Sequence, residues 1–179
     1  AGGNVMNYLY HRVPKYFKGK EVVPLNQLKK INPKAYSWAI GKYSEREHLL
    51  KIKIPILNCL WNDVIHMSPI HPGELEKETL KAGHNPWGSR KFFKINPKFL
   101  NQKNLAVYLY NSNKEKRILP EDFVPFKLKD LKKYKKIPKL TKDYYKKEFK
   151  SGRKPLAFSF VPHILYKGKL NVKDLEIIE

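Results

Sequence analysis

Three histidines in stretches with strand character are the residues of this sequence best suited to chemistry. His11 follows an apolar stretch near the start, His66 lies near the end of the apolar run 55–67, and His163 begins a late apolar run. An imidazole titrates near neutral pH, so it can act as a general acid or base, or hydrogen-bond a ribose or a phosphate. We therefore take His11 and His163 as candidate catalytic residues and His66 as a candidate nucleotide-binding residue. A purely structural role is the alternative for each.

Arginine is scarce in this chain of 37 basic residues, which draws attention to the positions that keep it. A guanidinium can bind a phosphate through two parallel hydrogen bonds, which an ammonium cannot do. Arg12 and Arg46 lie among apolar and aromatic residues, so we expect Arg46 to be catalytic and Arg12 to bind a nucleotide. The aromatic side chains of Trp61 and Tyr166 complete the candidate nucleotide-binding residues.

Residues 127–154 concentrate the positive charge. They hold twelve Lys and one Arg against three acidic residues, which is +10 of the formal net charge of +21. Such a surplus favours polyanions, and aromatic residues between the lysines can stack on bases. The segment is either a nucleic-acid-binding surface or a solvated helix whose aromatic residues face the core. The candidate nucleic-acid-binding residues are Lys132, Lys133, Lys135, Lys136, Tyr144, Lys146 and Lys147.

Composition and the lack of other motifs narrow the class of protein. An apolar fraction of 41% supports one packed domain over residues 1–179, and no apolar run is long enough to cross a membrane. The start lacks a signal-peptide pattern, Met6 is a candidate native start, and we expect a cytoplasmic protein. No glycine-rich phosphate loop is present. His66 and His71 lack the further well-spaced ligands of a zinc site, so we expect no metal.

Hydrophobic periodicity and turn residues predict short strands and short helices in irregular alternation. A capping box at Ser44 predicts one short helix, and Thr141 is the predicted cap of a helix with Tyr145 and Phe149 on one face. Strands are expected at 8–13, 63–67, 90–95, 105–110, 156–160, 163–166 and 175–178. The other helices are expected at 24–31, 33–41 and 73–82, the last with Leu75 and Leu80 inward. A loop is expected at 111–114. This mixture predicts an α+β fold with a central, mostly antiparallel sheet, which can be split in two, and short flanking helices.

Two stretches resemble segments of a known superfamily. The opening Leu9-Tyr10-His11 and the tail that runs from Pro162-His163 through Lys167-Gly168 to Ile178 are similar to parts of ADP-ribosyltransferase-like domains, especially the DNA-targeting toxins. The whole chain also resembles small uncharacterised bacterial proteins with a similar 60–64 stretch. The resemblance implies a cleft of NAD or nucleotide size, with NAD as a substrate.

The superfamily has its catalytic Glu where this chain has His163. RNA 2′-phosphotransferases share the fold and rely on Arg and His, a pattern closer to His11, Arg12, Arg46 and His163. Three functions stay open on this basis. The first is an ADP-ribosyltransferase-like enzyme that acts on NAD or on a nucleic-acid phosphate or ribose. The second is a non-catalytic nucleic-acid-binding module, and the third is a metal-independent, histidine-based nuclease of a toxin or defence system. The expected partner is DNA, RNA or a nucleotide in each case.

Overall fold

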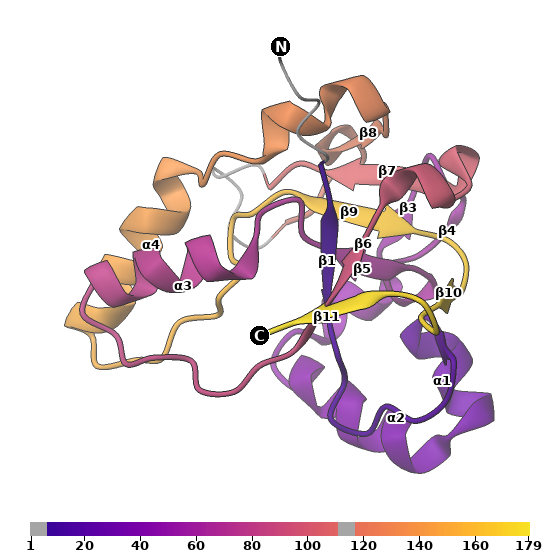
Figure 1. Cartoon of the computed structure of the whole chain (residues 1–179), viewed down its shortest axis with the longest axis horizontal. Coiled ribbons are helices and arrows are strands. Elements are labelled where there is room, and N and C mark those ends of the chain that lie inside the picture. The colour runs from indigo at the N-terminus through magenta and orange to yellow at the C-terminus, as the bar shows by residue number, and fades with distance from the viewer. Residues whose placement is uncertain (1–6, 111–116) are drawn as a thin grey trace.

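The computed structural model describes residues 7–110 and 117–179 and shows an α+β fold built around two antiparallel sheets (Figure 1). The first sheet has the order β1-β6-β11, formed by Leu9–Arg12, Phe92–Ile95 and Glu176–Ile178. The second has the order β5-β9-β7-β8, formed by Ile65–Met67, His163–Tyr166, Leu105–Tyr108 and Phe123–Pro125. The predicted start at Met6 and the predicted loop at 111–114 lie outside the described residues.

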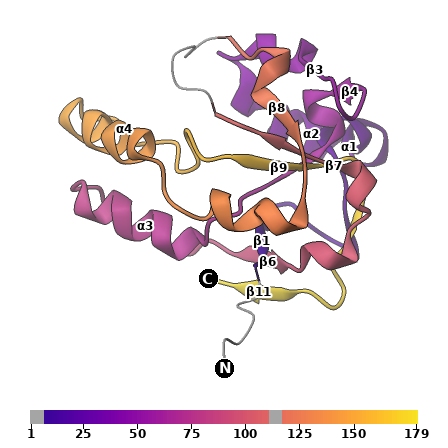
Figure 2. The same ribbon diagram turned by 90° about the horizontal axis from the view of Figure 1, so that it is seen from above.

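The two sheets are the halves of a split sheet. Tyr10 of β1 and Ser68, which follows β5, exchange two backbone hydrogen bonds of 2.9 and 2.8 Å. From this bridge the strands diverge, so that β1 crosses the direction of β9 in Figure 1 and the sheets form two layers in Figure 2. Two small antiparallel pairs complete the strands: β2 (Glu21–Val22) with β10 (Leu170–Asn171), and β3 (Lys53–Ile54) with β4 (Cys59–Leu60).

Strand alternation divides the core into two clusters on either side of the second sheet. Ile65, Met67 and Ile164 are buried against Leu9 and Phe93 of the first sheet, in the space between the two layers. The opposite face of the second sheet carries Ala106, Tyr108, Phe123 and Leu165, which pack against the chain between 43 and 64. Residues one apart in a strand therefore enter different clusters, as the two-residue period of a strand requires.

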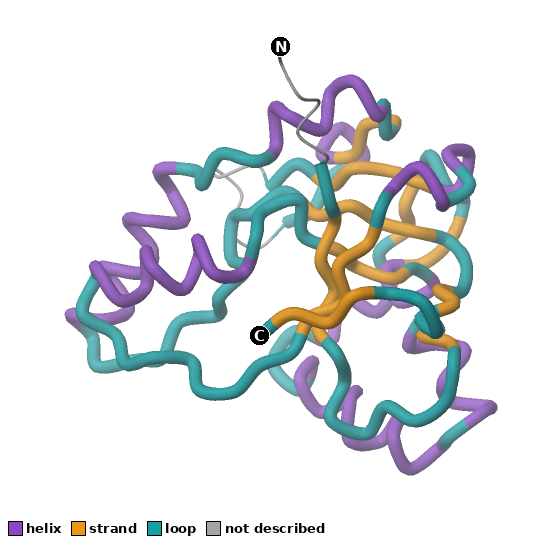
Figure 3. The backbone as a smooth tube through the Cα atoms, viewed as in Figure 1, coloured by secondary structure: helices purple, strands orange, loops and turns teal. Residues whose placement is uncertain are grey.

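The four α-helices lie at two ends of the sheets (Figure 1). The helices α1 (Leu25–Ile31) and α2 (Pro33–Ile40) pack together at one end, and α3 (Pro72–Lys81) and α4 (Lys139–Lys150) lie side by side at the other. Long loops follow α3 and α4 and lead back to the sheets (Figure 3). The 3-10 helices are Gly41–Tyr43, Glu47–Lys51, Trp61–Asp63, Pro97–Phe99, Gln102–Asn104, Pro120–Asp122 and Leu128–Tyr134.

The structure corrects four of the predicted details. Residues 156–160 form turns instead of a strand. Ser44 is not an N-cap: it is the C-cap residue of the 3-10 helix Gly41–Tyr43, and the next helix begins at Glu47 after Arg46. Leu80 is 42% exposed, because the apolar face of the short helix α3 is only wide enough to bury Leu75 and Thr79.

Thr141 is the fourth correction. It lies inside α4, and its hydroxyl donates to the Ser159 carbonyl at 2.9 Å because the loop after the helix folds back over it. Tyr145 and Phe149 lie four residues apart in α4 and so share one side of the helix as predicted; Tyr145 is buried there and Phe149 is 50% exposed. Among the described residues, no helix is long and apolar enough to span a bilayer.

Candidate active site

Three strands bring the predicted histidines together. His66 and His163 share a face of the second sheet, because His66 is opposite Leu165 in the register and Leu165 lies two residues from His163. Their ring centroids are 6.1 Å apart. His11 reaches them from β1, where the sheets diverge, and its Nδ1 lies 2.7 Å from the carbonyl oxygen of His66. We call His11, His66 and His163 the histidine cluster.

Backbone carbonyls hold each ring in one tautomer. A carbonyl oxygen can only accept a hydrogen bond, so the ring nitrogen that faces it must carry the proton. His11 thus donates from Nδ1 to His66, His66 from Nε2 to the Trp61 carbonyl at 2.8 Å, and His163 from Nδ1 to the Val161 carbonyl at 2.7 Å. For His11 and His66, the other nitrogen keeps its lone pair and makes no hydrogen bond with a described residue.

The histidine cluster is neutral at pH 7. Burial lowers the pKa of His66 to about 3, and the nearby titratable groups of His163, Lys42 and His11 further oppose its protonation. Burial also lowers the pKa of His11, again with a contribution from Lys42, and burial lowers the pKa of His163. No acidic side chain in the described part of the chain hydrogen-bonds to these rings. The rings therefore offer unprotonated nitrogens in a positive environment.

Two cations on the segment after α2 supply that environment. Arg46 donates from Nη2 to the Lys42 carbonyl at 2.9 Å, and both side chains lie over the Tyr43 ring, at 5.7 and 5.3 Å from its centroid. Burial and then the charges of Arg46 and Arg12 lower the pKa of Lys42. Burial raises the pKa of Tyr110, and the charge of Arg46 acts in the opposite direction and lowers it.

Aromatic side chains frame the histidine cluster. Trp61 packs under His66 at 4.7 Å between centroids, and Tyr110 packs beside His163 at 5.5 Å. Tyr110 in turn contacts Phe160 at 5.3 Å, and Phe160 contacts Tyr144 of α4 at 5.8 Å. Phe160 has a φ of 62°, a conformation that costs a non-glycine residue about 1 kcal/mol or more. The chain thus holds a strained residue at the edge of this site.

The other predicted nucleotide-binding residues are not all brought to the histidine cluster. Trp61 is 6% exposed, so it supports His66 and has no open face for a base. Tyr166 lies on the opposite face of the sheet from His163, because three residues separate them in one strand, and it lines a separate pocket with Phe99 and Leu170. Arg12 is exposed at the end of β1, and its charge acts on Lys42.

Ordinary structural roles account for the residues that were considered as metal ligands. The Asp63 carboxylate accepts from the Leu60 backbone at 2.8 Å and from the Asn26 amide at 2.8 Å. His71 accepts from the Gly73 backbone at 2.9 Å and so caps α3. Within residues 7–110 and 117–179, no three His, Cys, Asp or Glu side chains are placed to share a metal ion.

The Lys-rich segment, residues 127–154, is divided over several surfaces. Lys132 and Lys133 lie exposed on a 3-10 helix, Lys136 lies exposed after it, and Lys146 and Lys147 are exposed on α4. Lys135 differs from them because it is half-buried. Burial lowers the pKa of Lys135, and the Glu74 carboxylate acts in the opposite direction and raises it. Tyr144 is half-buried, and its hydroxyl accepts from the Leu156 backbone at 2.9 Å. Of the predicted nucleic-acid-binding residues, Tyr144 is the one that the aromatic contacts connect to the histidine cluster.

Sequence reasoning missed Lys42 and Tyr110, which surround the histidine cluster. Lys42 is one lysine among many, and Tyr110 comes just after the end of a strand, so neither has a local signal that separates it from similar residues. No family model matches the chain, and no curated protein and no solved structure matches it.

Proposed function

We propose that this protein is an enzyme that acts on the phosphate or ribose of a nucleotide or nucleic acid at the histidine cluster. The observation that supports this most directly is the convergence of three neutral, oriented imidazoles with Lys42 and Arg46. Cations beside the rings attract a phosphate, and imidazoles that are unprotonated at pH 7 can accept a proton from a hydroxyl or a water. The ring orientation is fixed before a substrate arrives, which lowers the reorganisation that the reaction needs.

The roles of the residues follow from their atoms. The second nitrogen of His11 is an acceptor, so His11 is the proposed general base. Arg46 is the proposed phosphate ligand, since its guanidinium has donors left after the bond to Lys42. A bound phosphate raises the pKa of nearby histidines, because its negative charge favours the imidazolium. His163 would become an acid in this way, able to protonate a leaving oxygen.

This proposal favours phosphate and ribose chemistry over carboxylate-assisted cleavage of NAD. His163 occupies the place where the ADP-ribosyltransferase-like pattern has its Glu, and no carboxylate of the described residues takes over that place. The arrangement agrees better with the resemblance to RNA 2′-phosphotransferases, which use Arg and His. NAD remains a ligand to test, because its pyrophosphate would meet the same cations.

The experiment is a turnover assay on the full chain with oligoribonucleotides, 2′- and 3′-phosphorylated ends, and NAD, with products identified by mass spectrometry. His163→Asn is the informative variant, because the Asn amide can still donate to the Val161 carbonyl while the second ring nitrogen is lost. His48→Asn is the matched control, since His48 is exposed on a 3-10 helix and, within the described residues, makes no hydrogen bond or ring contact with the histidine cluster.

Loss of turnover in His163→Asn and unchanged turnover in His48→Asn are the results expected. Turnover that survives His163→Asn removes this histidine from the mechanism. Tight binding of nucleic acid with no turnover of any substrate supports the non-catalytic binding module instead.

A further inference from the structure

A second candidate site lies away from the histidine cluster, where the loops that follow α3 and α4 meet. A pocket of about 410 Å³ opens there, which we call the α3–α4 pocket. Its volume falls within the range of small-molecule sites, roughly 300–1,000 Å³. The residues that carry the argument are Trp87, Arg90, Lys154, His84, Phe149 and Arg153.

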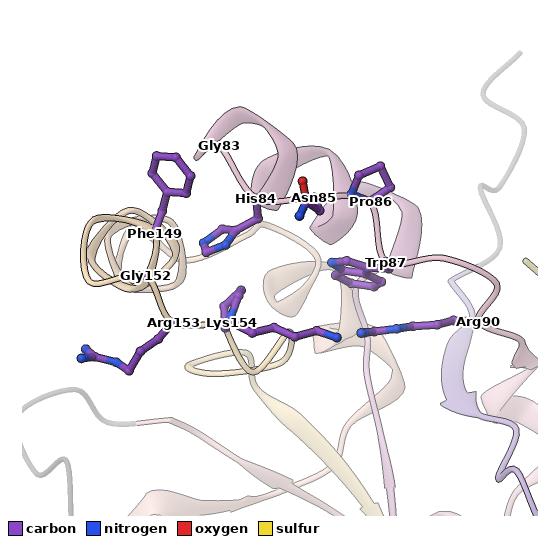
Figure 4. Close-up of a pocket in the computed structure, with 11 residues that line it drawn as sticks. Gly83, His84, Asn85, Pro86, Trp87, Arg90, Phe149, Gly152, Arg153 and Lys154 are labelled. Carbon is purple, nitrogen blue, oxygen red and sulfur yellow. The ribbon is translucent and has the colours of Figure 1, made fainter.

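Two cations converge in the α3–α4 pocket. In Figure 4 the amine end of Lys154 extends toward the guanidinium of Arg90. Within the described residues, neither side chain forms a salt bridge. Arg153 is different, because it points away from the pocket and binds the Glu148 carboxylate through two bonds of 2.8 and 3.0 Å. The Glu76 carboxylate acts on the Arg90 charge but forms no salt bridge with either cation within the described residues, and two cations that share a pocket without an ion-pair partner favour an anion there.

An aromatic ring holds one of these cations in position. The guanidinium of Arg90 lies 4.8 Å from the centroid of Trp87. Trp87 is itself held twice by α3, through Nε1 to the Thr79 hydroxyl at 3.0 Å and through its backbone N–H to Glu76 at 2.9 Å. A guanidinium stacked on a fixed indole is a preorganised platform, and both groups stack on nucleic-acid bases.

The rim of the pocket is also ordered. His84 donates from Nε2 to the Tyr145 carbonyl at 2.7 Å, which leaves Nδ1 as an acceptor, and its ring contacts Phe149 at 5.5 Å. Gly83 has a φ of 103°, and a Cβ there would lie 2.7 Å from the Phe149 ring. The positive φ favours glycine at this position, where the backbone passes close to Phe149, a side chain that is 50% exposed beside the pocket.

Charge connects the α3–α4 pocket with the histidine cluster. Burial and then the charge of Arg12 lower the pKa of Arg90, although Glu76 opposes them, and Arg12 acts in the same way on Lys42. The charge of Arg12 thus acts on one cation of each site. A chain of phosphates can follow such a series of cations, whereas a free mononucleotide can occupy one end alone.

We propose that the α3–α4 pocket binds one nucleotide of a single-stranded nucleic acid, with its phosphate between Arg90 and Lys154 and its base against the stacked Trp87 and Arg90. This inference deepens the proposed function. It rests on that function in one respect: the neighbouring part of the same strand is assigned to the histidine cluster. It names the substrate class as a single strand instead of a duplex or a free nucleotide.

The test is binding of a fluorescein-labelled oligouridylate of about eight nucleotides, a length typical of single-strand sites, to the full chain at several salt concentrations. The variant is Arg90→Gln with Lys154→Gln. The matched control removes two other cations, Lys34→Gln with Lys51→Gln, which are exposed and have no partner among the described residues. Both variants change the net charge equally, so long-range attraction is the same in each.

The pocket variant is expected to bind about tenfold more weakly than the control variant and to lower the slope of log K against log salt by about 0.7, the value for one phosphate of a single strand. Trp87→Phe is expected to remove most of the tryptophan quenching that the strand causes. Equal affinity of the pocket and control variants overturns the proposal. So does binding of uridine monophosphate or inorganic phosphate as tight as that of the oligonucleotide.

The readout separates this proposal from the proposed function. His163→Asn is expected to abolish turnover and to keep the affinity for the strand, while the pocket variant loses affinity. If no substrate is turned over but the pocket variant still loses affinity, the pocket stands and the enzymatic proposal fails. If turnover depends on His163 but the pocket variant binds like the control, the enzymatic proposal stands and the pocket proposal fails.

Discussion

The histidine cluster and the Lys-rich segment differ in the burial, charge and orientation of their side chains. The histidines are half-buried, uncharged, and each oriented by a backbone carbonyl. Most lysines of 127–154 are exposed, and among the described residues two bind acids of their own segment: Lys133 binds Asp130 at 3.1 Å and Lys139 binds Asp143 at 2.6 Å. Orientation and an altered pKa are what chemistry needs, whereas exposed charge acts at long range and is screened by salt. On this comparison we base the proposal that the reaction takes place at the histidine cluster and that the lysines attract the polyanion.

The largest expected effect separates the two regions by turnover. His163→Asn should lower the turnover number about 100-fold or more, because a positioned acid or base contributes at least that factor. Substrate affinity should stay nearly the same, since the cations remain. Steady-state kinetics with the substrate found in the screen measures both quantities. A change confined to KM would contradict a role in the chemical step.

The second prediction concerns stability between pH 7 and 5. The pKa of His66 is about 3 in the folded protein and 6.5 ordinarily, so the unfolded chain binds the extra proton as the pH falls below 6.5. Stability is therefore full above pH 6.5 and decreases toward pH 3. His66 alone should remove about 2 kcal/mol between pH 6.5 and 5, with losses in the same direction from His11 and His163.

Urea unfolding at several pH values measures this loss. In His66→Gln the amide can still donate to the Trp61 carbonyl, so the pH slope should become smaller whatever the absolute stability of the variant. The window stays above the range in which carboxylates titrate, which keeps their contribution out of the comparison. An unchanged slope would mean that His66 is protonated in the folded protein.

The third prediction tests the lysines. Replacing Lys132, Lys133, Lys146 and Lys147 by Gln should weaken oligonucleotide binding about tenfold at low salt and reduce the salt dependence. Turnover at saturating substrate should not change, since none of the four contacts the histidine cluster. Anisotropy and turnover assays on one preparation give both values. A fall in turnover at saturating substrate would mean that these lysines take part in the reaction at the histidine cluster, which contradicts the division of roles between the two regions.

The smallest expected effect concerns how α4 is attached to the rest of the molecule. The buried Tyr145 donates its hydroxyl to the Ala157 carbonyl. Tyr145→Phe should lower the free energy of unfolding by about 1 kcal/mol, the value of one such hydrogen bond. Thermal unfolding measures it, and Tyr144→Phe, at a half-buried position, is the comparison. If Tyr145→Phe leaves stability unchanged, the hydroxyl does not hold α4 to the loop.

Local pattern determined much of this protein from its sequence. The α+β class, the four α-helices and the strands with alternating or aromatic residues were predicted, because those signals repeat within a few residues. The failures were at 156–160, where an apolar stretch forms turns, at Leu80, whose exposure depends on how wide a contact the helix makes, and at the N-caps predicted for Ser44 and Thr141. Apolar character shows that a residue can be buried, but its neighbours determine whether it is.

The tertiary structure alone decided which of the candidate residues form a site. His11, His66 and His163 are far apart in sequence, and only the register of β5 with β9 and the bridge between β1 and Ser68 bring them together. The same register places Tyr166 on the other face. Strand pairing across such distances depends on the whole core, so no local pattern encodes it. The sequence identified the types of residue that are capable of chemistry, and the long-range contacts determined which of them lie together.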